Sequence, residues 1–193
     1  MAAELCALLA FSAIKNNDKV GLIVFTDQIE MFIAPRKGTS HVLRLIRELL
    51  TFKPRQAQTN INVALDYLGK VLHRRAVVFL ISDFQSEDYE KPLRVLNKRH
   101  DLVALSVTDP RELDMPDIGL VELEDAETGE RILIDTSSAA VRGQYKGLGA
   151  RRSGEIKETF RKIDVDHTEI VTGHNYVKDL VGFFKTREKR AQH

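Results

Sequence analysis

The sequence predicts a doubly wound α/β fold built around a mostly parallel sheet. Three short apolar runs, at 20–25, 76–81 and 102–107, are each followed by polar residues, as buried strands are. Amphipathic helical patterns lie between these runs, and strands that alternate with helices are typical of a parallel sheet with helices on both faces. The length of 193 residues fits a single domain over 1–193 with a core of its own.

The first third of the chain predicts a helix, two strands and a second helix. Residues 2–15 are apolar on nearly every side, which indicates a buried helix. Residues 20–25 (VGLIVF) predict a central strand covered on both faces, and 30–34 (EMFIA) predict a short strand that pairs with it and is ended by Pro35. Apolar residues then recur on one helical face, which predicts a helix over about 38–52.

Two helices and two strands alternate in the middle of the chain. A helix begins at Asn60, because apolar residues recur from there at i, i+3, i+4 and i+7. Residues 76–81 (AVVFLI) predict a second buried strand, 89–99 a helix, and 102–107 (LVALSV) a third strand. The pair Asp109-Pro110 ends that strand.

The last third of the chain predicts a hairpin, a long helix, a weak strand and a final helix. Residues 120–123 and 131–134, joined around Glu127-Thr128-Gly129, indicate a β-hairpin inserted after the third strand, over about 118–136. A helix capped by Ser137 or Ser138 extends to about Lys162, and its glycines predict a break or kink. The remaining elements are a strand at 168–171 and a helix at 175–189.

Composition and motifs exclude several classes of protein. A formal net charge of +1 gives no general attraction to nucleic acid, and the basic groups lack interleaved aromatic residues suited to base stacking. No apolar run is long enough to span a bilayer. Cys6 is the only cysteine, so we expect an inert core thiol and a reducing cytosolic setting. The six histidines lack metal-ligand spacing, which predicts surface or capping roles for them.

Polar residues follow each predicted strand of the parallel sheet. Asp27, Asp83 and Asp109 come just after the ends of these strands, and Thr59 lies in the loop before a helix. Ligands of open α/β sheets bind beyond the carboxyl ends of the strands, so these side chains are candidates for a binding site. An aspartate in this place is also a common turn former or helix cap, and that alternative stays open for Asp27 and Asp109.

Three segments carry a combined pattern: 17–27 (NDKVGLIVFTD), 58–68 (QTNINVALDYL) and 76–84 (AVVFLISDF). Together they resemble a von Willebrand factor A domain, and more closely the C-terminal part of the bacterial family called domain of unknown function 58. Domains of this type bind a divalent cation, Mg²⁺ or Mn²⁺, at a metal-ion-dependent adhesion site. By position, Thr59 and Asp83 match two ligands of that site, and the resemblance implies partner binding through Asp27, Thr59, Asn60 and Asp83. Further similarity to that family lies at 43–50, 101–110 and 119–136.

The sequence departs from this family pattern at its start. The Asp-x-Ser-x-Ser loop, which supplies the remaining metal ligands after the first strand, does not precede Ala2. We therefore expect an N-terminally incomplete domain that lacks its usual first strand. Its metal affinity should be on the order of millimolar or weaker, because two ligands cannot satisfy Mg²⁺. The missing strand would leave the edges of 20–25 and 76–81 open, which favours closure, rearrangement or strand swapping between chains in a homo-oligomer.

The resemblance implies a non-enzymatic protein–protein interaction domain. It also implies a cytoplasmic location, a full-length parent tethered to the bacterial inner membrane, and a MoxR-type AAA+ ATPase as the partner. The alternative is a metal-dependent hydrolase or phosphatase that uses a strand-end aspartate such as Asp83. That alternative needs a second acid and a lysine or arginine that converge on Asp83, and Lys53 and Arg55 are the only nearby cations in the sequence.

Overall fold

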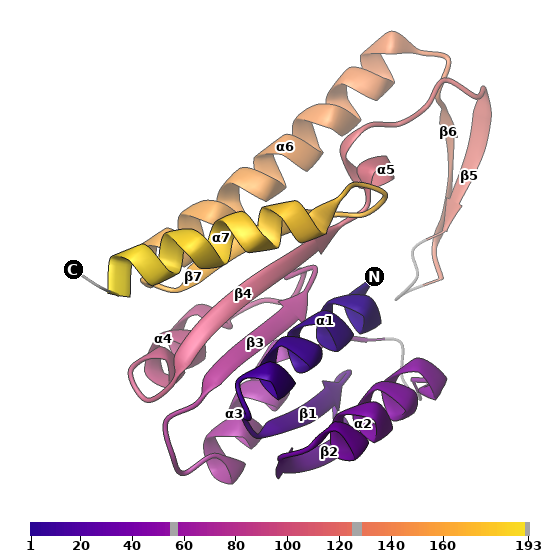
Figure 1. Cartoon of the computed structure of the whole chain (residues 1–193). Helices are drawn as coiled ribbons and strands as arrows, with labels where there is room; N and C mark the ends of the chain where they lie inside the picture. The colour runs from indigo at the N-terminus through magenta and orange to yellow at the C-terminus, as the bar shows by residue number, and fades with distance from the viewer. Residues whose placement is uncertain (55–57, 125–128, 192–193) are drawn as a thin grey trace. The chain divides into compact units, whose positions relative to one another are not determined.

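The computed structural model describes residues 1–54, 58–124 and 129–191. The chain divides into two compact units, each of which is described by itself (Figure 1). Unit 1 comprises residues 1–76 and 85–99, and unit 2 comprises residues 77–84 and 100–193. A single domain over 1–193 stays a prediction. Within the described ranges, every helix is too short or too polar to cross a membrane.

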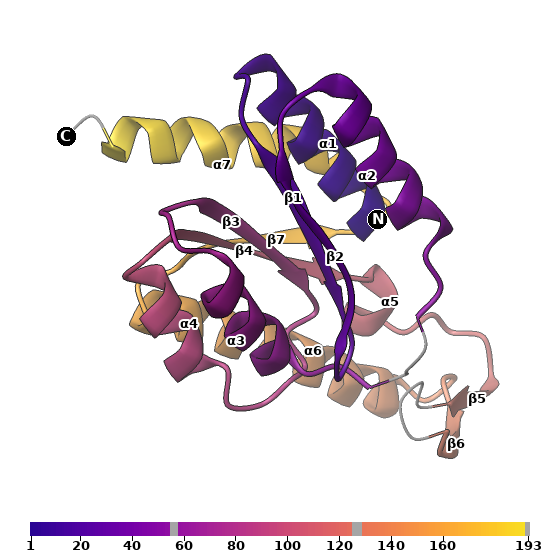
Figure 2. The same cartoon turned by 90° about the horizontal axis from the view of Figure 1, so that it is seen from below.

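Unit 1 is built on two antiparallel strands with helices on both sides. Leu22, Ile23 and Val24 of β1 lie opposite Ile33, Phe32 and Met31 of β2. In Figure 2, α1 and α2 lie on one side of this strand pair and α3 on the other. The elements are α1 (Ala2–Lys15), β1 (Val20–Phe25), β2 (Ile29–Arg36), α2 (Thr39–Thr51), α3 (Ile61–Val71) and α4 (Glu90–Asn97).

The helices of unit 1 form where the apolar spacing predicts them. In α3, Ile61, Leu65 and Leu68 are buried along one face, as apolar residues at helical spacing require. Asn60 caps this helix, because its side-chain oxygen accepts a hydrogen bond from the backbone N–H of Asn62 at 3.0 Å. The predicted start at Asn60 is therefore confirmed.

Two expectations for unit 1 are wrong. Helix α1 is not buried on all sides, since Leu8 is 37% exposed and Phe11 is 46% exposed. Pro35 does not end β2, which continues to Arg36. Because β2 pairs only with β1 among the described strands, the missing N–H of Pro35 can face the open side of the strand pair without loss. The absence of a side chain at Gly21 leaves room for this proline, since a Cβ on Gly21 would lie 2.9 Å from Pro35 Cγ.

Unit 2 contains a parallel sheet with one long helix on each face. The strand order is β3 (Val77–Ser82), β4 (Asp101–Thr108) and β7 (Asp166–Val171), and all neighbours are parallel. Helix α6 (Ala139–Lys162) covers one face and α7 (Tyr176–Ala191) covers the other, as Figure 2 shows. This arrangement confirms a mixed α/β fold with a parallel sheet flanked by helices, and limits the parallel pairing to three of the strands.

Side chains alternate between the two faces of this sheet with the period of two that a strand requires. On the α7 face, the rings of Phe79 and Phe184 meet edge to face at 5.8 Å. On the α6 face, the rings of Phe84 and Phe160 meet edge to face at 4.9 Å. Residues 102–106 of β4 are all buried, so both faces of this strand are covered, which explains its apolar run in the sequence. The core of unit 2 therefore lies in two layers, one under each helix.

Between β4 and α6, the chain forms a short helix, α5 (Pro110–Leu113), and two antiparallel strands, β5 (Leu120–Glu124) and β6 (Arg131–Asp135). These strands lie within the predicted hairpin; part of the turn predicted around Glu127 lies outside the described residues, and the insertion of a hairpin into a von Willebrand factor A-like domain stays a prediction. A break in the long helix is wrong, because α6 is continuous over 24 residues, and the alternative of a kink stays a prediction. The close packing of α6 on α5 requires a glycine at Gly149, since a Cβ there would lie 2.8 Å from the carbonyl oxygen of Glu112.

Candidate functional site

The end of β1 in unit 1 forms the first of two polar rims. Thr26 is 8% exposed, and its hydroxyl donates to a carboxylate oxygen of Glu30 at 3.0 Å. The same hydroxyl lies 3.3 Å from a carboxylate oxygen of Asp27, whose side chain is exposed. Thr26 therefore fixes the turn after the strand, while Asp27 faces solvent.

The loop before α3 joins the end of β1 through its backbone. The N–H of Asn60 donates to the carbonyl oxygen of Thr26 at 3.0 Å. The hydroxyl of Ser86 donates to the carbonyl oxygen of Thr59 at 3.0 Å, which ties a third segment of unit 1 to this loop. Asp27, Thr59 and Asn60 are all exposed. We call these three residues, with Thr26, the β1 rim.

The end of β3 in unit 2 forms the second rim. The backbone N–H of Phe84 donates to the hydroxyl of Ser82 at 3.1 Å, and Phe84 has a φ of 56°, so the chain turns sharply after the strand. Phe84 is 4% exposed and packs on Phe160, which anchors this turn in the core. Asp83, between Ser82 and Phe84, is exposed. The turn therefore presents Asp83 outward from a buried support.

Two further carboxylates share the region of Asp83. Asp109 caps α5, since its side chain accepts a hydrogen bond from the N–H of Arg111 at 2.8 Å, which confirms the capping alternative for this residue. Burial raises the pKa of Glu112, and the negative charges of Asp83 and Asp109 raise it further. We call Asp83, Asp109 and Glu112 the β3 rim. It favours positively charged groups in any ligand.

The donor set for a divalent cation is not assembled by the described residues. They contain no group of three or more histidine, cysteine or acidic side chains that could hold a metal ion. Thr59 belongs to unit 1 and Asp83 to unit 2, so the shared coordination of one ion by both stays a prediction. Mg²⁺ requires about six oxygen ligands, and this pair supplies two. The residues present therefore do not fit the metal site that the resemblance implies.

The structure also contains a polar network that sequence reasoning missed. It lies between the sheet of unit 2 and α6, and we call it the α6 network. The carboxylate of Glu169 accepts hydrogen bonds from Thr108 at 3.3 Å and from Ser153 at 3.1 Å, and pairs with the ammonium of Lys157 at 2.7 Å. Beside it, the hydroxyl of Ser106 lies 2.8 Å from Nε2 of His167.

Electrostatics in the α6 network follow from burial and from Lys157. Burial lowers the pKa of His167 to about 4, against the opposing influence of Glu169. Burial alone would raise the pKa of Glu169, but the hydrogen bond and charge of Lys157, together with Ser153 and Thr108, lower it. His167 is therefore neutral and Glu169 is ionised at neutral pH.

The Ser106–His167 pair has the atoms of a nucleophile and a base, but not the access that catalysis needs. Ser106 is 3% exposed, and the ring of Phe160 stacks on His167 with centroids 4.7 Å apart. A substrate carbonyl cannot reach a hydroxyl enclosed in this way. The hydrogen bonds and the ion pair of the network hold α6 to the sheet.

The expectation that all histidines have surface or capping roles is wrong. His100 is 2% exposed, and His167 is hydrogen-bonded beneath α6. A sequence signal for the α6 network does exist, because Ser106 and Thr108 on one strand, and His167 and Glu169 on the next, are two residues apart. Polar residues at this spacing indicate one polar face on neighbouring strands.

The sequence offered Lys53 and Arg55 as cations for a phosphatase at Asp83, and their placement near it stays a prediction. Lys53 belongs to unit 1, and Arg55 lies outside the residues that the structure describes. In unit 2, Arg152 lowers the pKa of Glu112 through its charge. Arg152 is thus a cationic group whose charge acts on the β3 rim.

Comparisons with known proteins agree on a family and on a fold. The family described as "Protein of unknown function DUF58" matches residues 1–155. An uncharacterised protein of Mycobacterium tuberculosis is 26% identical over 196 residues, covering 99% of this chain and 61% of that protein. An uncharacterised protein of Mycobacterium avium is 30% identical over 164 residues, covering 82% of this chain and 95% of that protein. The chain thus spans under two thirds of the length of the first relative.

A solved structure shares the fold of the chain. The crystal structure of the conserved hypothetical protein BatB from Bacteroides thetaiotaomicron superposes with a TM-score of 0.55, covering 97% of this chain and 88% of that one. The sequences are 16% identical, so the similarity speaks for the fold alone.

Proposed function

The chain belongs to the DUF58 family of proteins of unknown function, and from this premise we propose that it is a non-enzymatic protein–protein interaction domain that docks partners through its strand-end rims. One observation carries the proposal. At the ends of β1 and β3, exposed aspartates stand on turns that are fixed by hydrogen bonds or by buried aromatic packing. Such pre-organised polar groups bind partners at little entropic cost.

The polar groups of the rims suit recognition rather than chemistry. Asp27 and Asp83 are exposed, whereas Ser106 of the Ser–His pair in unit 2 is 3% exposed. A nucleophile must reach its substrate within about 3 Å, and a hydroxyl buried in this way does not meet that requirement. Exposed carboxylates at loop positions instead form contacts that choose a partner by its charge.

The partner that we propose is a MoxR-type AAA+ ATPase, and the rims are a remnant of a metal-ion-dependent adhesion site of a von Willebrand factor A-like domain. The proposal rests on the family resemblance and on the acidic character of the β3 rim. We further propose that this chain by itself binds Mg²⁺ or Mn²⁺ weakly or not at all, since Thr59 and Asp83 supply too few ligands. Isothermal titration with Mg²⁺ that gave micromolar affinity would contradict this part.

The strand edges support a further part of the proposal, a strand-swapped homo-oligomer. Strand β2 contains Pro35 and Arg36, and β7 contains Asp166 and Glu169, as is usual for edges that must avoid pairing. By contrast, β1 and β3 carry neither charge nor proline, and each pairs with one neighbour among the described strands. Light scattering should detect a concentration-dependent dimer; a monomer at every concentration that binds no apolar dye would contradict it.

Binding of a purified MoxR-type ATPase from the same genome tests the proposed function. Biolayer interferometry should show that Asp27→Ala and Asp83→Ala each weaken binding by about tenfold, as loss of a central interface residue does. Asp18→Ala is the matched control, because Asp18 is exposed and lies before β1 rather than after it. That control should stay within about twofold of the unmodified chain. Equal binding by all three variants would contradict the rim as the docking surface.

A phosphatase assay separates the proposal from its enzymatic alternative. The unmodified chain should show no turnover of a chromogenic phosphate ester above buffer, with or without Mg²⁺. Turnover that disappears in Asp83→Asn would replace the interaction domain with a hydrolase.

A further inference from the structure

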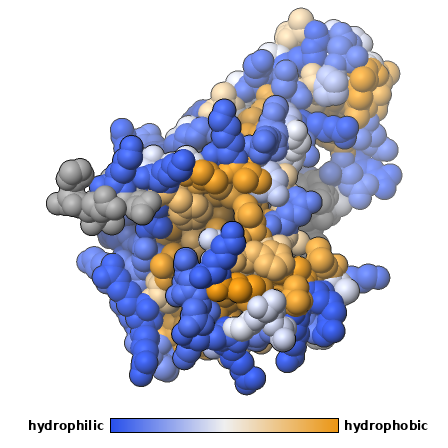
Figure 3. Space-filling model, viewed as in Figure 1, coloured by the Kyte–Doolittle hydropathy of each residue, from blue (hydrophilic) through white to orange (hydrophobic). Residues whose placement is uncertain are grey.

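The pair of strands formed by β5 and β6 in unit 2 is an exposed surface that the rims do not involve. We call it the β5–β6 ribbon. Leu120, Ile132 and Leu133 are 69%, 61% and 67% exposed, and Figure 3 shows apolar surface at this part of unit 2 with hydrophilic surface next to it. A two-stranded ribbon is marginally stable unless a third strand or another element covers it. The ribbon therefore has room for one more strand.

The base of the ribbon is held rigidly. Thr136 is completely buried, its N–H donates to the carbonyl oxygen of Gly119 at 2.8 Å, and its hydroxyl accepts from the N–H of Ile118 at 3.0 Å. Arg142 of α6 donates to the carbonyl oxygen of Thr136 and pairs with Asp117 at 3.1 Å. The two strands are thus fixed to α6 before any partner binds, which lowers the entropic cost of binding.

The outer edge of β5 presents unpaired backbone groups. Leu120 lies opposite Asp135. The neighbouring pair, Gly119 and Thr136, is hydrogen-bonded, since the N–H of Thr136 donates to the carbonyl oxygen of Gly119. In an antiparallel ladder the hydrogen-bonding residues alternate, so Leu120, Glu122 and Glu124 direct their N–H and C=O groups away from β6. Both ribbon strands pair only with each other among the strands that the structure describes. An added strand would meet three outward residues in register.

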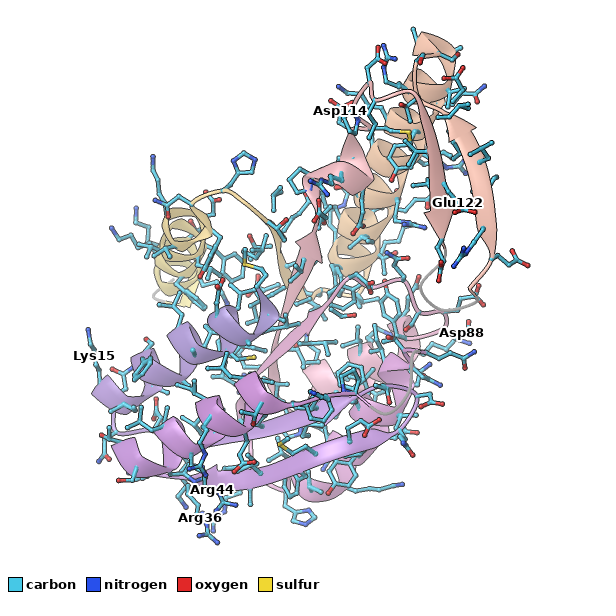
Figure 4. The ribbon with its side chains drawn as sticks, turned by 90° about the vertical axis from the view of Figure 1, so that its right-hand side faces the viewer. Lys15, Arg36, Arg44, Asp88, Asp114 and Glu122 are labelled. Carbon is cyan, nitrogen blue, oxygen red and sulfur yellow. The ribbon has the colours of Figure 1, made fainter. Side chains whose placement is uncertain are left out.

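The two faces of β5 differ in chemistry. Val121 and Leu123 lie on one face, opposite Ile134 and Ile132. Glu122 and Glu124 lie on the other face, which also carries the exposed Leu120 and Leu133, so apolar and acidic residues alternate over 121–124. Figure 4 labels Glu122 on the ribbon. The ribbon has four carboxylates and one guanidinium over 120–124 and 129–135. A strand that adds to β5 would therefore find an apolar neighbour and an acidic neighbour at alternate positions.

Strand β6, the observed neighbour of β5, contacts it through one basic side chain and through apolar side chains. The guanidinium of Arg131 reaches a carboxylate oxygen of Glu124 at 2.8 Å and one of Glu122 at 3.8 Å, and Ile132 pairs with Leu123. The carboxylates thus accept a basic group from the β6 side, and their charge exceeds what one arginine balances. The same chemistry on the open side calls for a second basic segment.

We propose that the open edge of β5 binds an extended segment of a partner protein in which apolar residues alternate with lysine or arginine. The segment adds as a third strand, with its backbone bonded to Leu120, Glu122 and Glu124. Its apolar side chains extend the Val121–Leu123 face, and its basic side chains meet the two glutamates. This surface is separate from the β1 and β3 rims, so it stands whether or not they dock an ATPase.

Three labelled peptides of about nine residues test the proposal with the full chain by fluorescence anisotropy. A peptide that alternates valine and lysine should bind at least about tenfold more tightly than one that alternates valine and glutamate, because the glutamates of β5 repel the latter. A peptide that alternates serine and lysine should also bind about tenfold more weakly. Equal binding of the two lysine peptides would reduce the effect to charge alone and overturn the proposal.

A matched pair of variants tests the role of the backbone edge. Both Glu122→Pro and Glu122→Ala remove the carboxylate, but only proline removes the outward N–H. The alanine variant should bind the valine–lysine peptide about threefold more weakly, and the proline variant about tenfold more weakly than the alanine variant. Circular dichroism must show both variants folded; Leu120→Pro against Leu120→Ala, at the first residue of β5, repeats the test if Glu122→Pro unfolds.

Light scattering identifies a competing occupant. The unmodified chain and Glu122→Pro should have the same mass in solution. A dimer that Glu122→Pro converts to a monomer would show that a second copy covers the edge, and would overturn the assignment to a partner protein.

Discussion

The strand-end rims and the α6 network are both polar, yet their side chains are held in opposite ways. At the rims, Asp27 and Asp83 are exposed, and the hydrogen bonds lie in the turns beneath them. In the α6 network, Ser106 is 3% exposed, and Glu169 accepts from three side chains. The difference teaches that polarity at a sheet has two uses in this protein. Exposed groups are available to partners, while enclosed groups attach a helix to its sheet.

The largest expected effect tests whether the buried side of this comparison is structural. Phe160 is completely buried, where it stacks on His167 and packs on Phe84. Phe160→Ala should lower the free energy of unfolding by about 3–5 kcal/mol, through lost burial and the cavity that remains. Urea unfolding measures the loss. Phe11→Ala, at a site that is 46% exposed, is the control and should cost about 1 kcal/mol or less.

The charge at the centre of the α6 network comes next. Glu169→Gln should lower the free energy of unfolding by about 1–3 kcal/mol, because Lys157 loses its counter-ion and two hydroxyls lose a charged acceptor. Thermal unfolding provides the measurement. Glu155 pairs with Arg151 at 2.8 Å on the surface, so Glu155→Gln should change stability by about 0.5 kcal/mol or less. Equal effects at the two positions would remove the distinction between enclosed and exposed polar groups.

The pH dependence of stability sharpens the same comparison. Burial lowers the pKa of His167 to about 4 in the folded chain, whereas an unfolded histidine has a pKa of about 6.5. Below about pH 6.5 the unfolded chain binds this proton and the folded chain does not, so stability is present above that pH and is lost as pH falls toward 4. Because His167 is not fully enclosed, we expect a loss of about 1–2 kcal/mol.

Urea unfolding at about pH 7.5 and about pH 5 checks this window, in which an unfolded carboxyl, with a pKa of about 4.3, contributes little. His167→Gln should lose most of the pH dependence, since its amide can still bond Ser106 but does not titrate. An unchanged slope in this variant would show that His167 is not the titrating group.

The smallest expected effect concerns the exposed side of the comparison. Asp27→Asn and Asp83→Asn should each change the free energy of unfolding by about 0.5 kcal/mol or less, because both side chains face solvent. The same substitutions should weaken partner binding, which distinguishes a binding group from a structural one. A decrease in the free energy of unfolding above about 1.5 kcal/mol would show that the substituted aspartate has a structural role.

Much of the fold could be predicted from local pattern. Val20–Phe25 and Ala2–Lys15 have their predicted bounds, since an apolar run and a helical repeat depend on the nearest residues. Local pattern misjudged Pro35 and the glycines of α6, because the position of a strand at an edge and the packing of a helix are decided by distant segments. The same reason explains why Leu8 and Phe11 are exposed despite their apolar surroundings in sequence.

The candidate site was predicted in part. The positions of Thr59 and Asn60 follow from the start of a helix, and that of Asp83 follows from the end of a strand. Both the start and the end can be predicted from neighbouring residues in the sequence. The bond between Asn60 and Thr26 joins residues 34 positions apart, and no local pattern indicates it. The α6 network was missed because its partners come from β4, α6 and β7, and only their packing brings the hydroxyls, carboxylate and ammonium together.

The sequence by itself determined which segments form strands and helices, which turns carry aspartate, and which family the chain resembles, because hydrophobic period and capping act within a few residues. The tertiary structure alone decided which polar groups are enclosed, how the pKa of His167 falls to about 4, and that β5 keeps an open edge. Burial and strand order are properties of packed elements, and residues far apart in the chain set them together.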